Sequence, residues 1–351
     1  MDTEQRDFLD SLLETASPSG FEQPSQRTWI DFLSPYADEI RTDEYGNAIA
    51  VHEGGESSVA LTGHADEIGF MVRDIDDAGY LRLTPIGGSD RTVSRGQHVQ
   101  VHTDEGPISG VIGQTAIHIR DTDEDAIQDI DEQYVDIGVD ERERAAELVE
   151  RGDPITFKQT ISELENERIA ARGLDNRIGI WAVADGFRQA VAADPDSTVY
   201  AVSTVQEELG AKGATMVGFD LDPDVAIAVD VTHATDDPGA PITKESGVEL
   251  GAGPVISRGS ANHSRVVAAV RSIAKAAGID VQLEATASGT GTDADAFYTT
   301  RGGTPSLNCS VPNRYMHTPV ETLDLRDLAA TADLLSEFAL RAHEFDYSLD
   351  F

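Results

Sequence analysis

Apolar positions recur with two different periods along this chain, which predicts a mixture of helices and strands. Between residues 4 and 13 they follow helical spacing, and a Ser-Pro-Ser-Gly sequence then ends the pattern. By the same criterion we expect further helices over about 23–33, 175–192, 261–277 and 326–343. Valine-rich or alternating stretches predict strands over about 39–41, 48–51, 58–62, 198–205, 225–231, 281–286 and 304–311.

The order of these elements predicts an α/β fold with one insertion. Strands and helices alternate in residues 1–70 and 164–351, which indicates a mostly parallel sheet sandwiched by helices. Residues 71–163 instead carry short alternating segments punctuated by glycines, which predicts a small inserted β-rich domain. Its one expected helix runs from an N-cap at Asp140 to Arg151 and ends at Gly152.

One strand leads directly into two adjacent carboxylates. The apolar run Val199–Val205 is followed by Glu207 and Glu208, at the strand end where open α/β sheets place their ligands. On an extended backbone, neighbouring side chains point to opposite sides, so one could bind a metal while the other handles a proton. Taken alone, the stretch is equally well explained as a solvated acidic loop.

Similar polar residues follow other predicted strands or open a helix: His64, Asp66, Asp175, Asp230 and His317. Each alone has an ordinary explanation, such as an N-cap for Asp175 or a buried core histidine for His317. Together they are harder to explain in that way, because carboxylates at the ends of apolar strands are costly to desolvate without cations. Two histidines and three carboxylates suffice to hold a pair of divalent metal ions.

Composition excludes several classes of partner. The 351 residues include 64 acidic and 26 basic side chains, and the formal charge of -38 argues against nucleic-acid binding. Only four of the basic residues are lysine, and the acidic excess extends along the whole chain, which indicates a halophilic, salt-accumulating source. No apolar run approaches the length of a membrane span, and the N-terminus lacks signal-peptide features, so we expect a cytoplasmic protein.

Two further features predict structure rather than chemistry. The single Cys309 lies in an apolar run, so we expect a buried thiol and not a nucleophile. The acidic run Arg120–Asp125 could bind calcium, but it lacks the glycine and terminal glutamate of an EF-hand loop. An exposed, solvated loop is the favoured interpretation.

Seven motifs resemble, in the right order, those of the dinuclear metal aminopeptidases that include the tetrahedral (TET), glutamyl and deblocking aminopeptidases. The resemblance covers nearly the whole chain, and the acidic composition fits a haloarchaeal-type member. The motifs are Gly63–Val72, Ile86–Gly88, Gly110–Gly113, Arg172–Arg177, Val205–Gly210, Gly291–Ala294 and Pro312–Glu321.

The resemblance implies a metal ligand set for two divalent ions, zinc or cobalt, in each subunit. Asp175 would bridge the ions, His64 and Asp230 would complete one site, and Glu208 and His317 would complete the other. The resemblance also implies a cis peptide bond after Asp175.

The remaining roles come from the same resemblance. Glu207 would act as general base and acid in removing N-terminal residues from peptide substrates. Asp66, two residues after His64 on the same strand face, would accept a hydrogen bond from that imidazole. The inserted domain would build subunit contacts in a homo-oligomer, a dimer or a dodecamer.

One departure and several alternatives remain open. Ala252 replaces a lysine that many relatives carry, which puts family-based expectations about substrate contacts in doubt. The same metal chemistry would serve a deacylase or a carboxypeptidase, and an inactive scaffold is a third reading. A glycosidase is rejected, because adjacent carboxylates on one strand cannot flank a glycosidic bond.

Overall fold

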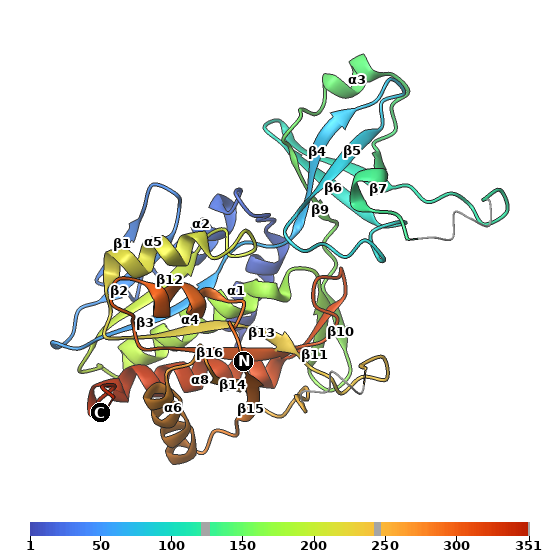
Figure 1. Ribbon diagram of the computed structural model, residues 1–351. Coiled ribbons are helices and arrows are strands. Elements are labelled where there is room, and N and C mark those ends of the chain that lie inside the picture. Colours follow the sequence, from blue (N-terminus) through green and yellow to red (C-terminus); the bar gives the residue numbers. More distant parts are fainter. Residues whose placement is uncertain (121–126, 242–246, 350–351) are drawn as a thin grey trace.

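The computed structural model describes residues 1–120, 127–241 and 247–349, which form an α/β body and a smaller β-barrel (Figure 1). The predicted fold class is confirmed. The main sheet has eight strands in the order β1 (Glu39–Thr42), β2 (Ala48–His52), β12 (Thr198–Thr204), β3 (Ser58–His64), β13 (Val225–His233), β16 (Ser306–Asn313), β14 (Val255–Gly259) and β15 (Gln282–Thr286). Because β12, β3, β13 and β16 run parallel to one another, their carboxyl ends meet at one edge of the sheet.

Helices cover both faces of this sheet. One face packs against α1 (Thr3–Glu14), α2 (Gln23–Leu33), α4 (Leu174–Ala192), α6 (Ser264–Ala277) and α8 (Leu325–Arg341). The other face packs against α5 (Lys212–Leu221) and α7 (Asp293–Thr299), around the buried side chain of Phe297. The sequence pattern predicted neither α5 nor α7. In α5, glycines at 213 and 218 weaken the helical signal, and α7 is only seven residues long.

The barrel closes in the order β4 (Gly69–Ile75), β5 (Leu81–Ile86), β8 (Tyr134–Asp136), β7 (Gly106–Ile112), β6 (His98–Thr103) and β9 (Pro154–Phe157). It has a hydrophobic core of its own, which includes Phe70, Leu83 and Val101. A 3-10 turn, η2 (Ile130–Glu132), precedes β8. The barrel stands away from the α/β body, to which the chain connects it before β4 and after β9 (Figure 1).

The helix expected over 140–151 is shorter than predicted. α3 spans only Arg142–Ala146, and its N-cap is Glu141, without a side-chain hydrogen bond, rather than Asp140. The helix ends early because Val149 packs into the barrel core and the chain then turns at Gly152 to enter β9. Pro154, the first residue of that strand, also disfavours helical backbone at the residue before it.

A second, three-stranded sheet lies beside the main body. It consists of β10 (Ser162–Leu164), β11 (Arg168–Ala171) and β17 (Glu321–Asp324), and η4 (Ala342–Glu344) follows α8. β11 leads directly toward α4, so this small sheet holds the segment that precedes Asp175.

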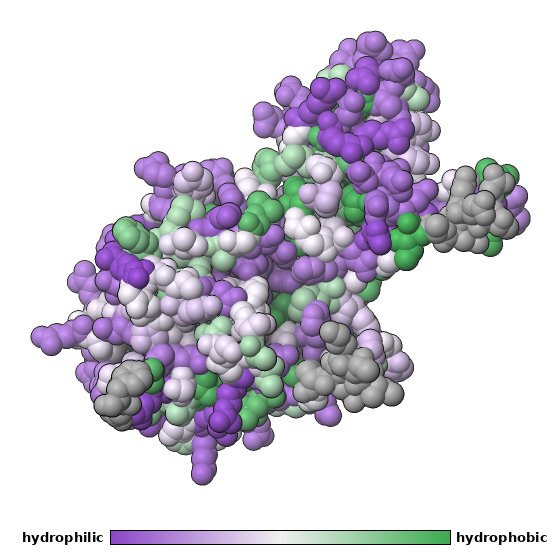
Figure 2. All heavy atoms as spheres, in the orientation of Figure 1, coloured by the Kyte–Doolittle hydropathy of each residue, from purple (hydrophilic) through white to green (hydrophobic). Residues whose placement is uncertain are grey.

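The surface agrees with the acidic composition. Hydrophilic residues cover most of the visible face and are densest on the barrel (Figure 2). Cys309 is buried, as predicted. Among the described residues, no helix combines the length and apolar character needed to cross a membrane. The predicted loop at 120–125 lies almost entirely outside the described residues, so its expected exposure stays a prediction.

Candidate metal centre

The five predicted metal ligands meet at the carboxyl edge of the parallel strands. His64 is the last residue of β3, and Asp230 lies near the end of β13. Glu208 lies in the turn after β12, and His317 lies in the loop after β16. Asp175 is the second residue of α4, and its peptide bond to the next residue is cis.

Their side chains form two groups that share Asp175. His64, Asp175 and Asp230 form one group, Asp175, Glu208 and His317 form the other, and the candidate ligand atoms within each group lie within 4.8 Å of one another. Oδ1 of Asp175 is 3.4 Å from Nε2 of His64, and its Oδ2 is 3.3 Å from Nε2 of His317. The two oxygens of one carboxylate therefore face two different histidines.

The spacing fits shared metal ions. Ligand bonds of about 2.0–2.1 Å in tetrahedral geometry place two donor atoms of one zinc ion about 3.3 Å apart. The two distances from Asp175 to the histidines are close to this value. Two others are similar, since Nε2 of His64 is 3.6 Å from Oδ1 of Asp230 and Nε2 of His317 is 3.5 Å from Oε1 of Glu208. Hydrogen bonds to Asp175 and Glu208 raise the pKa of His317 to about 11, so the carboxylates around this imidazole favour a positive charge at its position. Imidazole and carboxylate side chains both serve as ligands of divalent metal ions in proteins.

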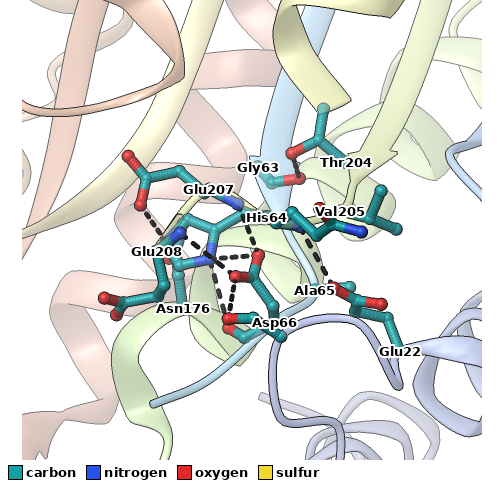
Figure 3. Close-up of polar contacts among 12 residues, drawn as sticks. Glu22, Gly63, His64, Ala65, Asp66, Asn176, Thr204, Val205, Glu207 and Glu208 are labelled. Atoms are coloured by element: carbon teal, nitrogen blue, oxygen red, sulfur yellow. Dashed lines mark hydrogen bonds and ion pairs between the residues drawn. The ribbon is translucent and has the colours of Figure 1, made fainter. Parts of the chain in front are cut away.

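Glu207 and Glu208 do not lie on extended backbone. β12 ends at Thr204, Gln206 has a positive φ of 55°, and both glutamates occupy the following turn. The premise that an extended strand separates their side chains is therefore wrong. Their side chains nevertheless diverge (Figure 3). Glu208 approaches His317, whereas Oε2 of Glu207 lies 3.8 Å from Nε2 of His64.

Burial sets the protonation of Glu207. Together with the negative charges of Asp230 and Asp293, burial raises the pKa of Glu207 to about 10, although His64 opposes the shift. Divalent cations in the two ligand groups would reverse much of this effect, because a nearby positive charge favours the ionised carboxylate.

Asp66 holds the histidine and the glutamate turn together. Its carboxylate is fully buried and accepts the backbone N–H of Glu207 at 2.9 Å, the N–H of Glu208 at 3.1 Å and the hydroxyl of Ser19 at 2.6 Å. Nδ1 of His64 lies 3.1 Å from the backbone carbonyl oxygen of Asp66 and 3.3 Å from its Oδ1, which leaves Nε2 free to face the ligand group (Figure 3). β3 ends at His64, so Asp66 is on the connection to β4 and not on the strand face that was expected.

Glu321 is a residue of the site that the sequence reasoning did not assign. It is 2% exposed; its Oε1 accepts the backbone N–H of His317 at 2.8 Å, and its Oε2 accepts that of Asp175 at 3.1 Å. Burial raises its pKa to about 8. One carboxylate therefore fixes the backbone of two candidate ligands from different elements. Its position at the end of the motif Pro312–Glu321 was the available signal.

A buried ion cluster also went unassigned. Glu67 pairs with Arg172, and its Oε1 lies 2.6 Å from Nη2 of Arg177. All three residues are at most 4% exposed. Against the opposing effect of burial, these arginines lower the pKa of Glu67 to about 2. The cluster links the segment after His64 to the start of α4.

The barrel contributes backbone to the centre. Nδ1 of His317 lies 3.1 Å from the carbonyl oxygen of Gly88, in the loop that follows β5. A Cβ atom at Gly88 would lie 2.8 Å from that Nδ1, so a side chain there would displace the imidazole. The neighbouring Gly87 has a φ of +64°, and a Cβ atom there would lie 3.0 Å from Oε2 of Glu208. The motif Ile86–Gly88 is therefore part of the site.

The ligand groups open into a cavity of about 450 Å³. Glu207 and all five candidate ligands line it, together with side chains from β13, β14, β15 and β16. Ala252 does not line it among the described residues.

Comparisons with known proteins cover nearly the whole chain. The family model described as M42 glutamyl aminopeptidase matches residues 46–334. A lysyl aminopeptidase of Pyrococcus furiosus is 34% identical over 348 residues, which are 97% of this chain and 99% of the relative. The crystal structure of a TET aminopeptidase from a marine sediment archaeon, Thaumarchaeota archaeon SCGC AB-539-E09, has a TM-score of 0.91 at 32% identity and covers 97% of each chain.

A second solved structure is that of the TET1 peptidase of Pyrococcus horikoshii, which can assemble into a tetrahedron or a large octahedral shell. Its TM-score is 0.86 at 33% identity, with 96% of this chain and 99% of that chain covered.

Proposed function

Because this chain belongs to the M42 glutamyl aminopeptidase family and is a metal-dependent aminopeptidase, we propose that its two ligand groups hold two divalent ions beside Glu207. Zinc or cobalt is the proposed metal. The observation that carries the proposal is the carboxylate of Asp175, whose two oxygens face His64 and His317 separately. Bound there, the ions would polarise the scissile carbonyl and lower the pKa of the attacking water.

Glu207 is the proposed general base and acid. It lines the cavity, it belongs to neither ligand group, and Asp66 holds its backbone N–H. Its carboxylate can accept a proton from the attacking water and deliver that proton to the leaving amine. Asp66 and Glu321 are positioning residues in this scheme, because they act through His64, Asp175 and the glutamate turn.

The experiment is metal analysis of the purified protein, together with hydrolysis of aminoacyl anilides in concentrated KCl with and without a chelator. We expect two ions per subunit, loss of activity on chelation and recovery when metal returns. Full activity with one ion or none would contradict the two-ion proposal.

We also propose that the chain forms a homo-oligomer, a dimer or a dodecamer, through the barrel. The assembly of the related TET1 peptidase supports this, as do the exposed side chains of Ile117 and Ile119, at 72% and 79%. Soluble oligomers are usually closed and symmetric, so light scattering in concentrated salt should show a single defined mass. A monomer at every concentration would contradict the assembly and leave the catalytic proposal standing. The cytoplasmic location and halophilic source stay predictions.

A further inference from the structure

The glutamate turn, residues 205–208, is held by side chains from distant segments. β12 ends at Thr204, so these four residues lie beyond its ladder of backbone hydrogen bonds. Each of their N–H groups donates instead to a side-chain oxygen, and the three acceptor residues are at most 4% exposed. The pairs are Val205 with Asn47 at 2.9 Å, Gln206 with Glu22 at 3.1 Å, and Glu207 and Glu208 with Asp66 at 2.9 and 3.1 Å.

Glu22 is the carboxylate of this set that has no role so far. It directly precedes α2, but its side chain does not cap that helix. Its Oε1 accepts the N–H of Gly20 at 2.7 Å as well as that of Gln206, and it does not line the cavity that holds the metal ligands. Figure 3 shows Glu22 at the Val205 end of the turn, away from the side chain of Glu207. Any effect of Glu22 on the reaction therefore passes through the backbone of the turn.

The backbone of Gln206 depends on contacts of this kind. Its φ of 55° lies in the left-handed region, which residues with a Cβ atom rarely adopt. Such a conformation persists where the surrounding structure holds it in place. Because Gln206 directly precedes Glu207, a change in its backbone angles would turn the carboxylate of Glu207 away from the metal ligands. The hydrogen bond to Glu22 therefore helps to set the direction of Glu207.

Hydrogen bonding, and not charge, is what Glu22 supplies to the turn. Both N–H groups converge on one of its oxygens, Oε1. Burial raises the pKa of Glu22 to about 7. Oε1 can accept both N–H groups whether Oε2 is ionised or carries a proton, and the amide oxygen of a glutamine could accept them in the same way.

We propose that Glu22 is a positioning residue for the general base, and that it holds the backbone of Gln206 so that Glu207 faces the metal ligands. The inference rests on the proposed function, in which Glu207 takes the proton of the attacking water. In the described part of the chain, the side chain of Glu22 forms hydrogen bonds with Gly20 and Gln206 and with none of the candidate metal ligands. Loss of its contact should therefore lower turnover and leave metal binding intact.

The test separates the reach of the side chain from its charge. Glu22→Gln keeps the length and an acceptor oxygen but loses the charge, whereas Glu22→Asp keeps the charge and is one methylene too short to reach Gln206. kcat, KM and bound metal per subunit are measured with an aminoacyl anilide in concentrated KCl. Asp327→Ala is the control, because Asp327 is also buried, accepts the N–H groups of Gly251 and Gly253 at 2.7 and 2.8 Å, and does not line the cavity.

We expect Glu22→Asp to lower kcat by at least about tenfold, and up to the order of 10²-fold, with little change in KM and with the metal content of the wild type. Glu22→Gln should keep a kcat close to that of the wild type. Asp327→Ala should be less stable than the wild type but should keep its kcat per metal-loaded subunit.

Three results would overturn the inference. The first is a normal kcat in Glu22→Asp. The second is a loss of kcat in Glu22→Gln, which would assign the effect to charge. The third is a loss of bound metal in Glu22→Asp that accounts for its loss of activity. Absence of anilide hydrolysis by the metal-loaded wild type would instead overturn the proposed function.

Discussion

Replacing Asp66 by asparagine tests how the centre is held together. Oδ1 of Asp66 accepts the backbone N–H of Glu207, and Oδ2 accepts that of Glu208. Whichever way the asparagine amide turns, its NH2 group must therefore face one of these two N–H groups. The side chain is fully buried, so water cannot replace the lost acceptor.

The cost can be worked from these contacts. One buried N–H left unpaired costs about 1–3 kcal/mol, and loss of a residue that orients a metal ligand weakens metal affinity or activity about 10- to 100-fold. Asp66→Asn should lower kcat and metal affinity within that range. Metal titration of the chelated protein against a chromophoric competitor measures the affinity, and anilide hydrolysis at saturating metal measures kcat.

Asp185→Asn is the matched control. Asp185 is also buried, at 1% exposure, and it accepts hydrogen bonds from Arg188, Gln5 and Gln189, away from the cavity. The Asp185→Asn protein should be less stable than the wild type but should bind metal with unchanged affinity. Wild-type affinity and turnover in Asp66→Asn would refute the positioning role, and so would an equal loss of metal affinity in Asp185→Asn.

Three further predictions concern the barrel, acid stability and salt. Gly88→Ala should displace His317 and lower the amount of metal bound per subunit. Gly302→Ala is the control and should leave the metal content unchanged, because an added Cβ atom there meets nothing within 4 Å. Unchanged metal content in both variants would contradict the predicted clash. The pKa of Glu67 is lowered from 4.5 to about 2, so the stability that its carboxylate contributes is complete above pH 4.5 and is lost as the pH falls toward 2. That contribution to the free energy of unfolding is on the order of 3 kcal/mol. Circular dichroism should show that Glu67→Gln loses less stability than the wild type as the pH falls from 4.5 to 2. Equal losses of stability in the two proteins would contradict this prediction. The charge of -38 should make the fold depend on salt near 1 M, where the Debye length is about 3 Å, and full stability in dilute buffer without divalent metal would count against halophilic adaptation.

Local sequence patterns predicted much of the fold because strand and helix periods are local properties. The valine-rich strands and the polar residues that follow them predict that His64, Asp230 and the two glutamates lie near one sheet edge. The elements that the sequence pattern did not predict are short or carry residues that disfavour their structure. β14 is five residues long, and α5 contains two glycines.

Contacts between distant segments could not be predicted in this way. Gly88 and His317 are 229 positions apart, and only the placement of the barrel brings them together. Glu321 is one of 64 acidic residues, and no local pattern distinguishes its buried carboxylate from the solvated ones. The position of Asp66 beyond the end of β3 likewise follows from its partners in other segments.

The most direct measurement compares Glu207→Gln with Glu208→Gln, because the proposed mechanism assigns these neighbours different tasks. Glu207→Gln should keep two ions and lose at least on the order of 10²-fold in kcat, without rescue by added metal, since an amide cannot accept the proton. Glu208→Gln should bind less metal and recover part of its activity when metal is added, since an amide is a poorer ligand than a carboxylate. Near-normal turnover of Glu207→Gln with two ions bound would contradict the mechanism, and so would metal loss in Glu207→Gln with rate loss alone in Glu208→Gln.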